Sequence, residues 1–238
     1  MSVMPEPRQL VPRRTMRPGP VDNRNIGEAL RRIKREVRQY DLPIVTLVAN
    51  TAGDPFKVLI STMLSLRTKD LVTAAASERL FAVADTPRAM AALPVERMAR
   101  LIYPVGFYKT KARSIQRTCE LLLGEHGGVV PPDMDALLRL PGVGRKTANL
   151  VLTLGYRKHA MCVDTHVHRI SNIWGYVKTK DPHGTEMELR AKLPRRYWMS
   201  YNDLLVSFGQ HLCVPVSPKC SQCPMFDLCP RIGVKRSR

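Results

Sequence analysis

The most informative part of the chain is the stretch Leu138-Arg139-Leu140-Pro141-Gly142-Val143-Gly144-Arg145-Lys146-Thr147-Ala148. Its two glycines flank one apolar residue, and glycine tolerates the positive φ angles and close backbone approach of a tight hairpin. A helical pattern follows over residues 144–157, with an apolar face formed by Ala148, Val151, Leu152 and Gly155. The first N–H groups of a helix lack partners and favour an anion. We therefore predict a hairpin between two helices that can hold a phosphate, although a purely structural turn would use the same residues.

The rest of the chain also has helical periodicity. From Gly27, apolar side chains recur at helix spacing as far as Tyr40. Further helix-like segments are expected at about 54–65, 69–84, 94–103, 108–125, 133–139, 144–157, 165–177, 184–193 and 199–212. Glycine and proline punctuate the breaks between them. Since alternating strand-like runs are nearly absent, we predict an all-α protein.

Charge favours a polyanionic partner. The 238 residues contain 38 Lys and Arg against 20 Asp and Glu, a formal net charge of +18. Residues 1–26 are rich in Pro and Arg and lack a hydrophobic period, which predicts a disordered basic arm. Without this arm the charge is still +15, so most of the basic surface belongs to the folded body.

The cysteines indicate a metal centre. No apolar stretch is long enough to span a bilayer, and no secretory signal begins the chain, so we expect an intracellular protein with reduced thiols. The last 26 residues hold four cysteines spaced Cys-x6-Cys-x2-Cys-x5-Cys, namely Cys213, Cys220, Cys223 and Cys229. Four thiolates suit either tetrahedral zinc or a [4Fe–4S] cluster, and the spacing alone does not decide. Cys119 and Cys162 are expected to be buried free thiols.

Over roughly residues 27–230, the chain resembles the endonuclease III family of helix-hairpin-helix DNA glycosylases. The run Leu-Pro-Gly-Val-Gly-Arg-Lys-Thr-Ala at 140–148 and the cysteine spacing carry this resemblance. It implies an all-α, two-lobed glycosylase fold and a [4Fe–4S] cluster held by the four cysteines. The implied parts are a basic arm (1–26), an iron–sulfur cluster domain (27–47 plus 159–230), a six-helix barrel domain containing the helix-hairpin-helix (48–158) and a basic tail (231–238).

The resemblance also implies a catalytic pair. Lys146 matches the family's nucleophile, and the segment Val163–Arg169 matches the region that supplies its catalytic aspartate, here Asp164. Only a neutral amine is nucleophilic, and an ordinary lysine is roughly 0.04% neutral at pH 7. The chemistry therefore needs a lysine whose pKa is tuned by its surroundings, together with a proton acceptor. A carboxylate beside the amine supplies the acceptor. The alternatives are a phosphate contact for Lys146 and a helix N-cap for Asp164.

Two further loops match segments that act when a base is extruded from the duplex. Relatives usually hold glutamine where this chain has Arg67, so preference for the opposite base is open while the chemistry is unaffected. In the segment Gly106–Ala112, Phe107 is the candidate apolar wedge, with ordinary core packing as its alternative. The resemblance further places Gly142, Val143, Gly144 and Arg145 at the DNA.

These features predict a base-excision repair DNA glycosylase that removes oxidised pyrimidines such as thymine glycol. The same lysine would provide AP lyase activity, by β-elimination through a Lys146 Schiff base. The alternatives are a monofunctional adenine or mismatch glycosylase and a non-catalytic DNA-binding iron–sulfur protein. We expect a monomer that acts on double-stranded DNA containing damaged bases or abasic sites, without a membrane partner. If the protein is prokaryotic, it should be cytoplasmic and associated with the nucleoid.

Overall fold

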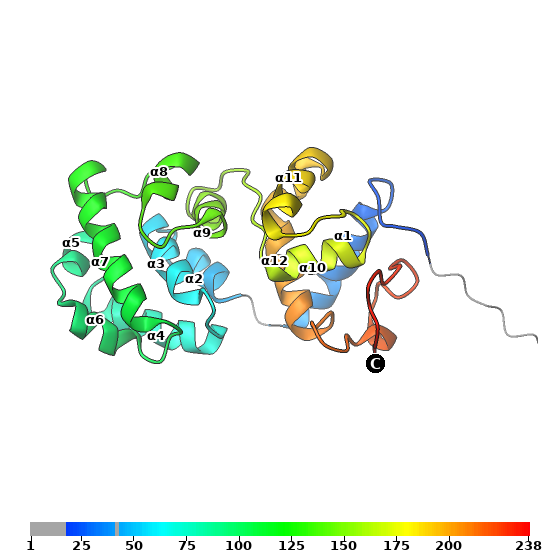
Figure 1. Ribbon diagram of the computed structural model, residues 1–238, viewed down its shortest axis with the longest axis horizontal. Helices are drawn as coiled ribbons and strands as arrows, with labels where there is room; N and C mark the ends of the chain where they lie inside the picture. Colours follow the sequence, from blue (N-terminus) through cyan, green and yellow to red (C-terminus); the bar gives the residue numbers. More distant parts are fainter. Residues whose placement is uncertain (1–17, 41–42) are drawn as a thin grey trace, which may run out of the picture.

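The computed structural model describes residues 18–40 and 43–238, and within these ranges every regular element is a helix (Figure 1). The all-α prediction is therefore confirmed. None of the helices in the described ranges is both long and apolar enough to span a bilayer. In chain order the elements are α1 (Ile26–Glu36), η1 (Val37–Gln39), α2 (Ile44–Ala52), α3 (Pro55–Ser65), α4 (Asp70–Val83), α5 (Pro87–Ala91), α6 (Val95–Ile102), α7 (Tyr108–Glu125), α8 (Met134–Arg139), α9 (Arg145–Leu150), the π-helix η2 (Val151–Gly155), α10 (Thr165–Ile173), α11 (Pro182–Lys192), η3 (Arg195–Tyr197), α12 (Trp198–His211) and η4 (Cys220–Gln222).

The chain forms two lobes, each with its own hydrophobic core, and Figure 1 shows them side by side along the long axis. The core of the barrel lobe runs from Ile44 to Ala160. The core of the second lobe combines α1 with residues from Met161 to Cys229. α1, near the start of the chain, thus packs against α12, near its other end. The barrel core begins at Ile44 and not at residue 48, because Ile44, Val45 and Ala49 of α2 are buried in it.

Two of the described α-helices, α2 and α5, lie outside the predicted segments. α2 has the sequence IVTLVANTA, a nearly continuous apolar run without an amphipathic period, so its helical state depends on tertiary packing. It ends at Gly53, whose φ of 58° is the usual left-handed C-terminal conformation. α5 spans only five residues, too few for a periodic pattern.

Both predicted tails include residues that belong to the folded second lobe. Val21 is fully buried and its N–H donates to the Trp174 carbonyl at 2.9 Å, so the predicted arm of residues 1–26 is too long. Residues 1–17 lie outside the described part. The predicted basic tail of residues 231–238 packs back onto the lobe: the N–H of Ile232 donates to Ile173 O, and that of Arg238 to Pro218 O, each at 3.0 Å. Single apolar side chains and backbone hydrogen bonds hold these segments, and neither leaves a periodic signal.

Aspartate caps begin several of the helices that build the site. Asp133 accepts the Ala136 N–H at the start of α8, and Asp181 accepts the Gly184 N–H at the start of α11, where Pro182 follows it. Asp164 caps α10 in the same way. These caps mark where α8, α10 and α11 begin, although the predicted helix at 184–193 starts two residues later than α11.

Candidate active site

The predicted hairpin joins α8 to α9 and so forms a helix-hairpin-helix. Gly142 has a φ of 77°, and a Cβ there would lie 3.2 Å from both Met63 Cε and Ser114 Cβ. Gly142 thus meets a conformational and a packing requirement inside the barrel lobe. A Cβ at Gly144, the N-cap of α9, would meet no atom within 4 Å. This end of the hairpin is therefore open to an external group.

Lys146 and Asp164 lie together although they come from different lobes. Lys146 Nζ, on α9, is 4.0 Å from Asp164 Oδ2, and the two side chains are 37% and 8% exposed. Asp164 Oδ1 accepts the N–H groups of His166 and Val167 at 2.8 and 2.9 Å, which is the N-cap role considered above. The carboxylate therefore caps α10 with one oxygen and turns the other toward the amine.

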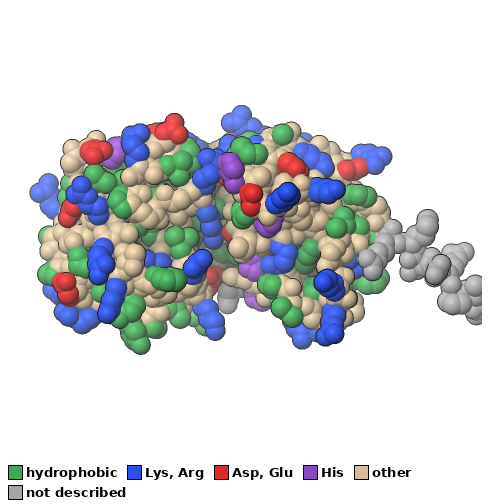
Figure 2. Space-filling view, in the orientation of Figure 1, with side chains coloured by type: hydrophobic (Ala, Val, Ile, Leu, Met, Phe, Trp, Pro, Cys, Tyr) green, Lys and Arg blue, Asp and Glu red, His purple; other side chains and the backbone are tan. Residues whose placement is uncertain are grey.

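The pair opens into a cleft between the lobes, which we call the interlobe cleft. It has a volume of about 700 Å³ and is lined by Leu66, Arg67, Phe107, Lys111, Lys146, Val163, Asp164, Thr165 and Pro182. Figure 2 shows Lys and Arg side chains along the boundary between the two lobes. The sequence-predicted residues of the pair and of both wedge loops thus meet in one space.

Arg67 and Phe107 face each other across two tight loops. Both are non-glycine residues with positive φ (55° and 59°), and the Arg67 guanidinium lies 5.6 Å from the Phe107 ring centre. The ring is 62% exposed, so core packing does not explain it. The loops can touch because residue 106 is glycine: a Cβ there would be 2.7 Å from the Arg67 carbonyl oxygen. Strained, exposed side chains at a cleft are typical of functional positions.

The buried Lys111 supports the loop that carries Arg67, and it was not predicted. Its Nζ donates to Leu64 O at 2.7 Å, to Leu66 O at 2.5 Å and to Thr68 Oγ1 at 3.3 Å. Burial lowers the pKa of Lys111 to about 8. The available signal was its position four residues before Ile115, which puts a charge beside the apolar stripe of α7.

A second, smaller cavity of about 170 Å³ adjoins the pair and also went unpredicted. Its polar lining includes Asp70, His166 and Asp203 besides Lys146 and Asp164. Burial lowers the pKa of His166 and raises the pKa of Asp203. His166 fits there only beside a glycine, since a Cβ at residue 209 would lie 2.4 Å from its Nδ1. These residues come from three separate segments, so no local motif could group them.

The Arg145 side chain forms an ion pair within the protein. Its Nε and Nη2 donate to the two carboxylate oxygens of Glu186 on α11, at 2.9 and 2.7 Å. Those two donors are consequently not free for a phosphate, and contact between Arg145 and DNA stays a prediction.

The four cysteines surround one small apolar cavity in the second lobe, which we call the cysteine cavity. Trp174, Phe208, Leu212 and Met225 complete much of its wall. Burial raises the pKa of the Cys213 and Cys223 thiols to about 12 and also raises that of Cys229. In the described ranges, no group of three or more His, Cys, Asp or Glu side chains has the geometry of a bound metal site. Four thiols that line one apolar cavity nevertheless supply the donor set of a [4Fe–4S] cluster, which takes one thiolate at each iron.

The two remaining cysteines are free and buried, as predicted. Cys119 lies in the barrel core, and burial raises its pKa to about 12. Cys162 lies in the segment between the lobes, and burial raises its pKa as well. Raised pKa values make both thiols poor nucleophiles.

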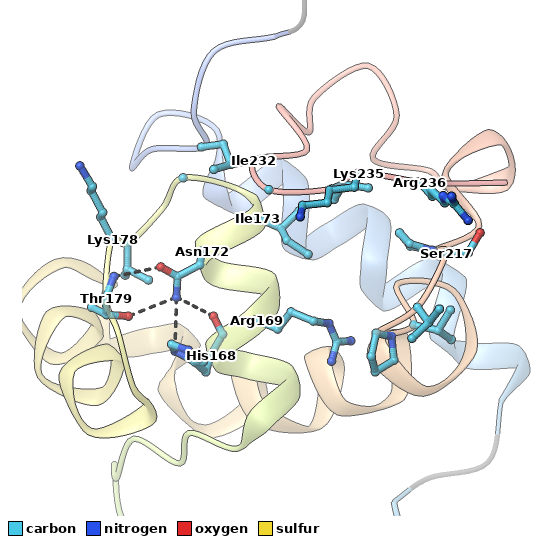
Figure 3. A pocket seen from close by; sticks show the side chains of 18 of the residues that line it. His168, Arg169, Asn172, Ile173, Lys178, Thr179, Ser217, Ile232, Lys235 and Arg236 are labelled. Carbon is cyan, nitrogen blue, oxygen red and sulfur yellow. Dashed lines mark hydrogen bonds between the residues drawn. The ribbon is translucent and has the colours of Figure 1, made fainter.

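A larger cavity of about 1070 Å³ flanks α10 on the side of the C-terminal segment (Figure 3). Its charged lining is basic, with Arg169, Lys178, Lys235 and Arg236 and no Asp or Glu. In Figure 3, Asn172 connects the end of α10 to Thr179, whose N–H donates to Asn172 Oδ1 at 2.9 Å. Basic side chains thus line a second cavity, which lies on the second lobe.

Comparison with known proteins agrees with this geometry. Residues 60–195 match the HhH-GPD superfamily of base excision DNA repair proteins, and residues 213–229 match the iron–sulfur binding domain of endonuclease III. Endonuclease III of Thermotoga maritima is 47% identical, with 74% of this chain and 83% of the relative covered. Endonuclease III-like protein 1 of Gallus gallus is 38% identical, with 90% and 80% covered.

Among solved structures, a trapped covalent intermediate of endonuclease III with DNA aligns with a TM-score of 0.77 at 31% identity. The alignment covers 88% of this chain and 96% of that one. Together with the helix-hairpin-helix and the four-cysteine cavity, these matches confirm the resemblance and the cofactor inferred from the sequence. The chain belongs to the endonuclease III family of HhH-GPD base-excision repair proteins, which are DNA glycosylases with AP lyase activity and carry a [4Fe–4S] cluster.

Proposed function

We propose that this protein removes oxidised pyrimidines from double-stranded DNA and then nicks the abasic site through a Schiff base on Lys146. The observation that carries the proposal is the 4.0 Å separation of Lys146 Nζ and Asp164 Oδ2 at the floor of the interlobe cleft. The amine is partly exposed to the cleft, whereas the carboxylate is held by its cap hydrogen bonds. The likeness to an endonuclease III trapped covalently on DNA supports the same chemistry.

The reaction requires a neutral Lys146 amine beside a group that can accept its proton. The Lys146 nitrogen forms a bond to the sugar C1′ as the bond from C1′ to the base breaks, and the base leaves with the electron pair and takes up a proton. The amine loses its proton to a neighbouring acceptor, a role that Asp164 Oδ2 can fill from 4.0 Å away, and the sugar ring opens to an imine as O4′ takes up a proton. Loss of a C2′ proton then breaks the C3′–O bond and releases the 3′ phosphate. The fixed carboxylate also offsets positive charge that develops on the sugar.

The residues around the pair supply the DNA contacts in this proposal. The open end of the hairpin at Gly144 admits a phosphate to the backbone N–H groups of α9. Arg67 and Phe107 project from tight loops at the cleft and fill the gap left by the extruded nucleotide. In this proposal the protein acts as a monomer.

Cys213, Cys220, Cys223 and Cys229 would hold the [4Fe–4S] cluster in the cysteine cavity. When bound, the cluster supplies a rigid cross-link, since its four iron corners are taken by cysteine and leave no site for substrate. The cavity shares Ile173 and Trp174 with α10, the helix that Asp164 caps. The cysteines therefore act on the chemistry only by fixing α10.

Borohydride trapping tests the proposal. Wild-type protein is incubated with duplexes that contain an abasic site or thymine glycol, and borohydride reduces any imine to a stable covalent adduct. We expect an adduct on both duplexes, its loss in Lys146→Ala, and its retention in Lys34→Ala, which removes an exposed lysine of α1. Base release without an adduct would indicate the monofunctional alternative, and binding without turnover the non-catalytic one.

A further inference from the structure

A buried carboxylate, that of Glu186, links the two lobes through Arg145, the residue before Lys146. Glu186 lies on α11 of the second lobe, and its side chain is only 4% exposed. Both of its oxygens accept hydrogen bonds from Arg145, the first residue of α9, in a two-pronged ion pair. Such paired hydrogen bonds restrict orientation as well as distance.

The ion pair belongs to a larger cluster across the same boundary. Arg190, one turn further along α11, donates through Nε to Glu186 Oε1 at 3.0 Å. Its Nη2 donates to Asn149 Oδ1 on α9 at 3.2 Å. Two residues of α9 and two of α11 are thus joined, and Glu186 is the one carboxylate between two guanidinium groups. Burial alone would raise the pKa of Glu186, but the hydrogen bonds from Arg145 and Arg190 outweigh it and hold the pKa below its usual range.

The position of this cluster matters because the helix pairs that pack most closely all lie within one lobe. The Arg145–Glu186 ion pair and the Arg190–Asn149 hydrogen bond therefore join α9 to α11 where helix packing is sparse. Lys146 belongs to the barrel lobe and Asp164 to the other, so any rotation between the lobes changes the separation of amine and carboxylate. Removal of one partner from a buried ion pair leaves an uncompensated charge and is strongly unfavourable.

We propose that Glu186 is a positioning residue that holds the start of α9 against α11 and thereby keeps Lys146 within reach of Asp164. The inference rests on the proposed function, because it concerns the geometry of that pair. Glu186 touches neither amine nor substrate in this role. It also keeps the Arg145 guanidinium directed at α11 and away from the open face of the hairpin.

The test compares Glu186→Gln and Glu186→Asp with wild type in single-turnover excision and borohydride trapping. Affinity is measured separately on a duplex with a tetrahydrofuran abasic analogue, which binds without reacting. We expect the glutamine variant to react about 10- to 100-fold more slowly, the range for a small misplacement of reacting groups. Its affinity for the analogue should stay within about 3-fold, since binding uses the unchanged hairpin and wedge loops. The aspartate variant keeps the charge and should recover part of the rate.

Hydrogen exchange gives a second measurement that does not depend on turnover. In Glu186→Gln, exchange should rise in residues 145–150 and 182–192 and stay unchanged in α3, inside the barrel core. Glu188→Gln, which changes an exposed carboxylate of the same helix, is the matched control for both measurements. In the double variant with Arg145→Ala, the loss of rate should be no larger than the greater of the two single losses, because both substitutions break one ion pair.

An active wild type with an equally fast Glu186→Gln variant and unchanged exchange would overturn the inference. Equal losses of rate and affinity, or a lowered iron content, would do so as well, because they would indicate a general structural role. A wild type that forms no adduct would instead reject the proposed function. The exchange measurement would still decide whether Glu186 holds the two helices together.

Discussion

The interlobe cleft and the cysteine cavity differ in how the chain builds them. The cysteine cavity lies within one lobe, and its four thiols come from 17 consecutive residues, 213–229. The interlobe cleft draws its residues from both lobes, over positions 66 to 182, and its central pair meets across the boundary. The cysteine cavity is small and apolar, whereas the interlobe cleft is larger and holds the charged pair of Lys146 and Asp164. A cofactor site can thus be set by local sequence, while the catalytic pair depends on how two separately folded cores are oriented.

Loss of one thiol should have the largest effect, because cluster binding depends on all four cysteines. In Cys223→Ser we expect loss of most of the iron and of the brown colour, together with a lower melting temperature of the second lobe. Elemental analysis and absorbance measure the first, and calorimetry measures the second. Cys119→Ala removes a thiol from the barrel core and should keep its iron. Full iron content in Cys223→Ser would show that this thiol is not a ligand.

The Asp164→Asn substitution separates the two roles of the carboxylate, which are the cap of α10 and the charge beside Lys146. Asparagine is also a good N-cap, so α10 should keep its start and the melting temperature should change by only a few degrees. The charge next to Lys146 is lost, and we expect single-turnover excision to slow by about 100-fold or more. Asp181→Asn makes the same change at the cap of α11 and should leave the rate unaltered. An excision rate within about 3-fold of wild type would show that Asp164 serves only as the N-cap of α10.

Lys111→Met tests whether the wall of the interlobe cleft depends on a buried amine. The substitution leaves the carbonyls of Leu64 and Leu66 without their donor, which should lower the free energy of unfolding of the barrel lobe by about 1–3 kcal/mol. The loop with Arg67 should also loosen and weaken binding to the abasic analogue. Denaturant titration and a binding assay measure the two effects. The exposed Lys109 on the same helix supplies the control, Lys109→Met, and equal behaviour of the two variants would contradict the assignment.

The two hairpin glycines should respond differently to alanine. Gly142→Ala places a side chain at a φ of 77° against Met63 and Ser114 and should destabilise the protein by about 1–2 kcal/mol. Gly144→Ala meets open space and should cost less than about 1 kcal/mol. It should nevertheless weaken binding to duplex DNA, because its methyl group stands where a phosphate would approach. Equal stability losses would show that both glycines serve only the turn.

The features that were readable from the sequence are local. The predicted helix at 108–125 coincides with α7, and the hairpin forms where two glycines and a proline predict it. Periodicity and caps suffice there, because each depends on residues within one or two turns. α2 was missed since its apolar run has no period, and the buried Val21 was assigned to a disordered arm. Lys111, His166 and Glu186 went unpredicted because the cited partners of each lie 41 to 47 residues away in the sequence.

By itself the sequence determined that the chain is helical, basic and equipped with four closely spaced cysteines, and its motifs identified the family. Spacing along the chain did not bring Lys146 to Asp164; the resemblance implied it, and the packed lobes place the two atoms 4.0 Å apart. Tertiary structure alone decided that Asp164 divides its oxygens between a cap and the amine, that Arg145 turns to Glu186, and that Phe107 stays exposed. The physical reason is that these contacts depend on the orientation of one hydrophobic core relative to another, and that orientation is set by burial and ion pairing between distant segments.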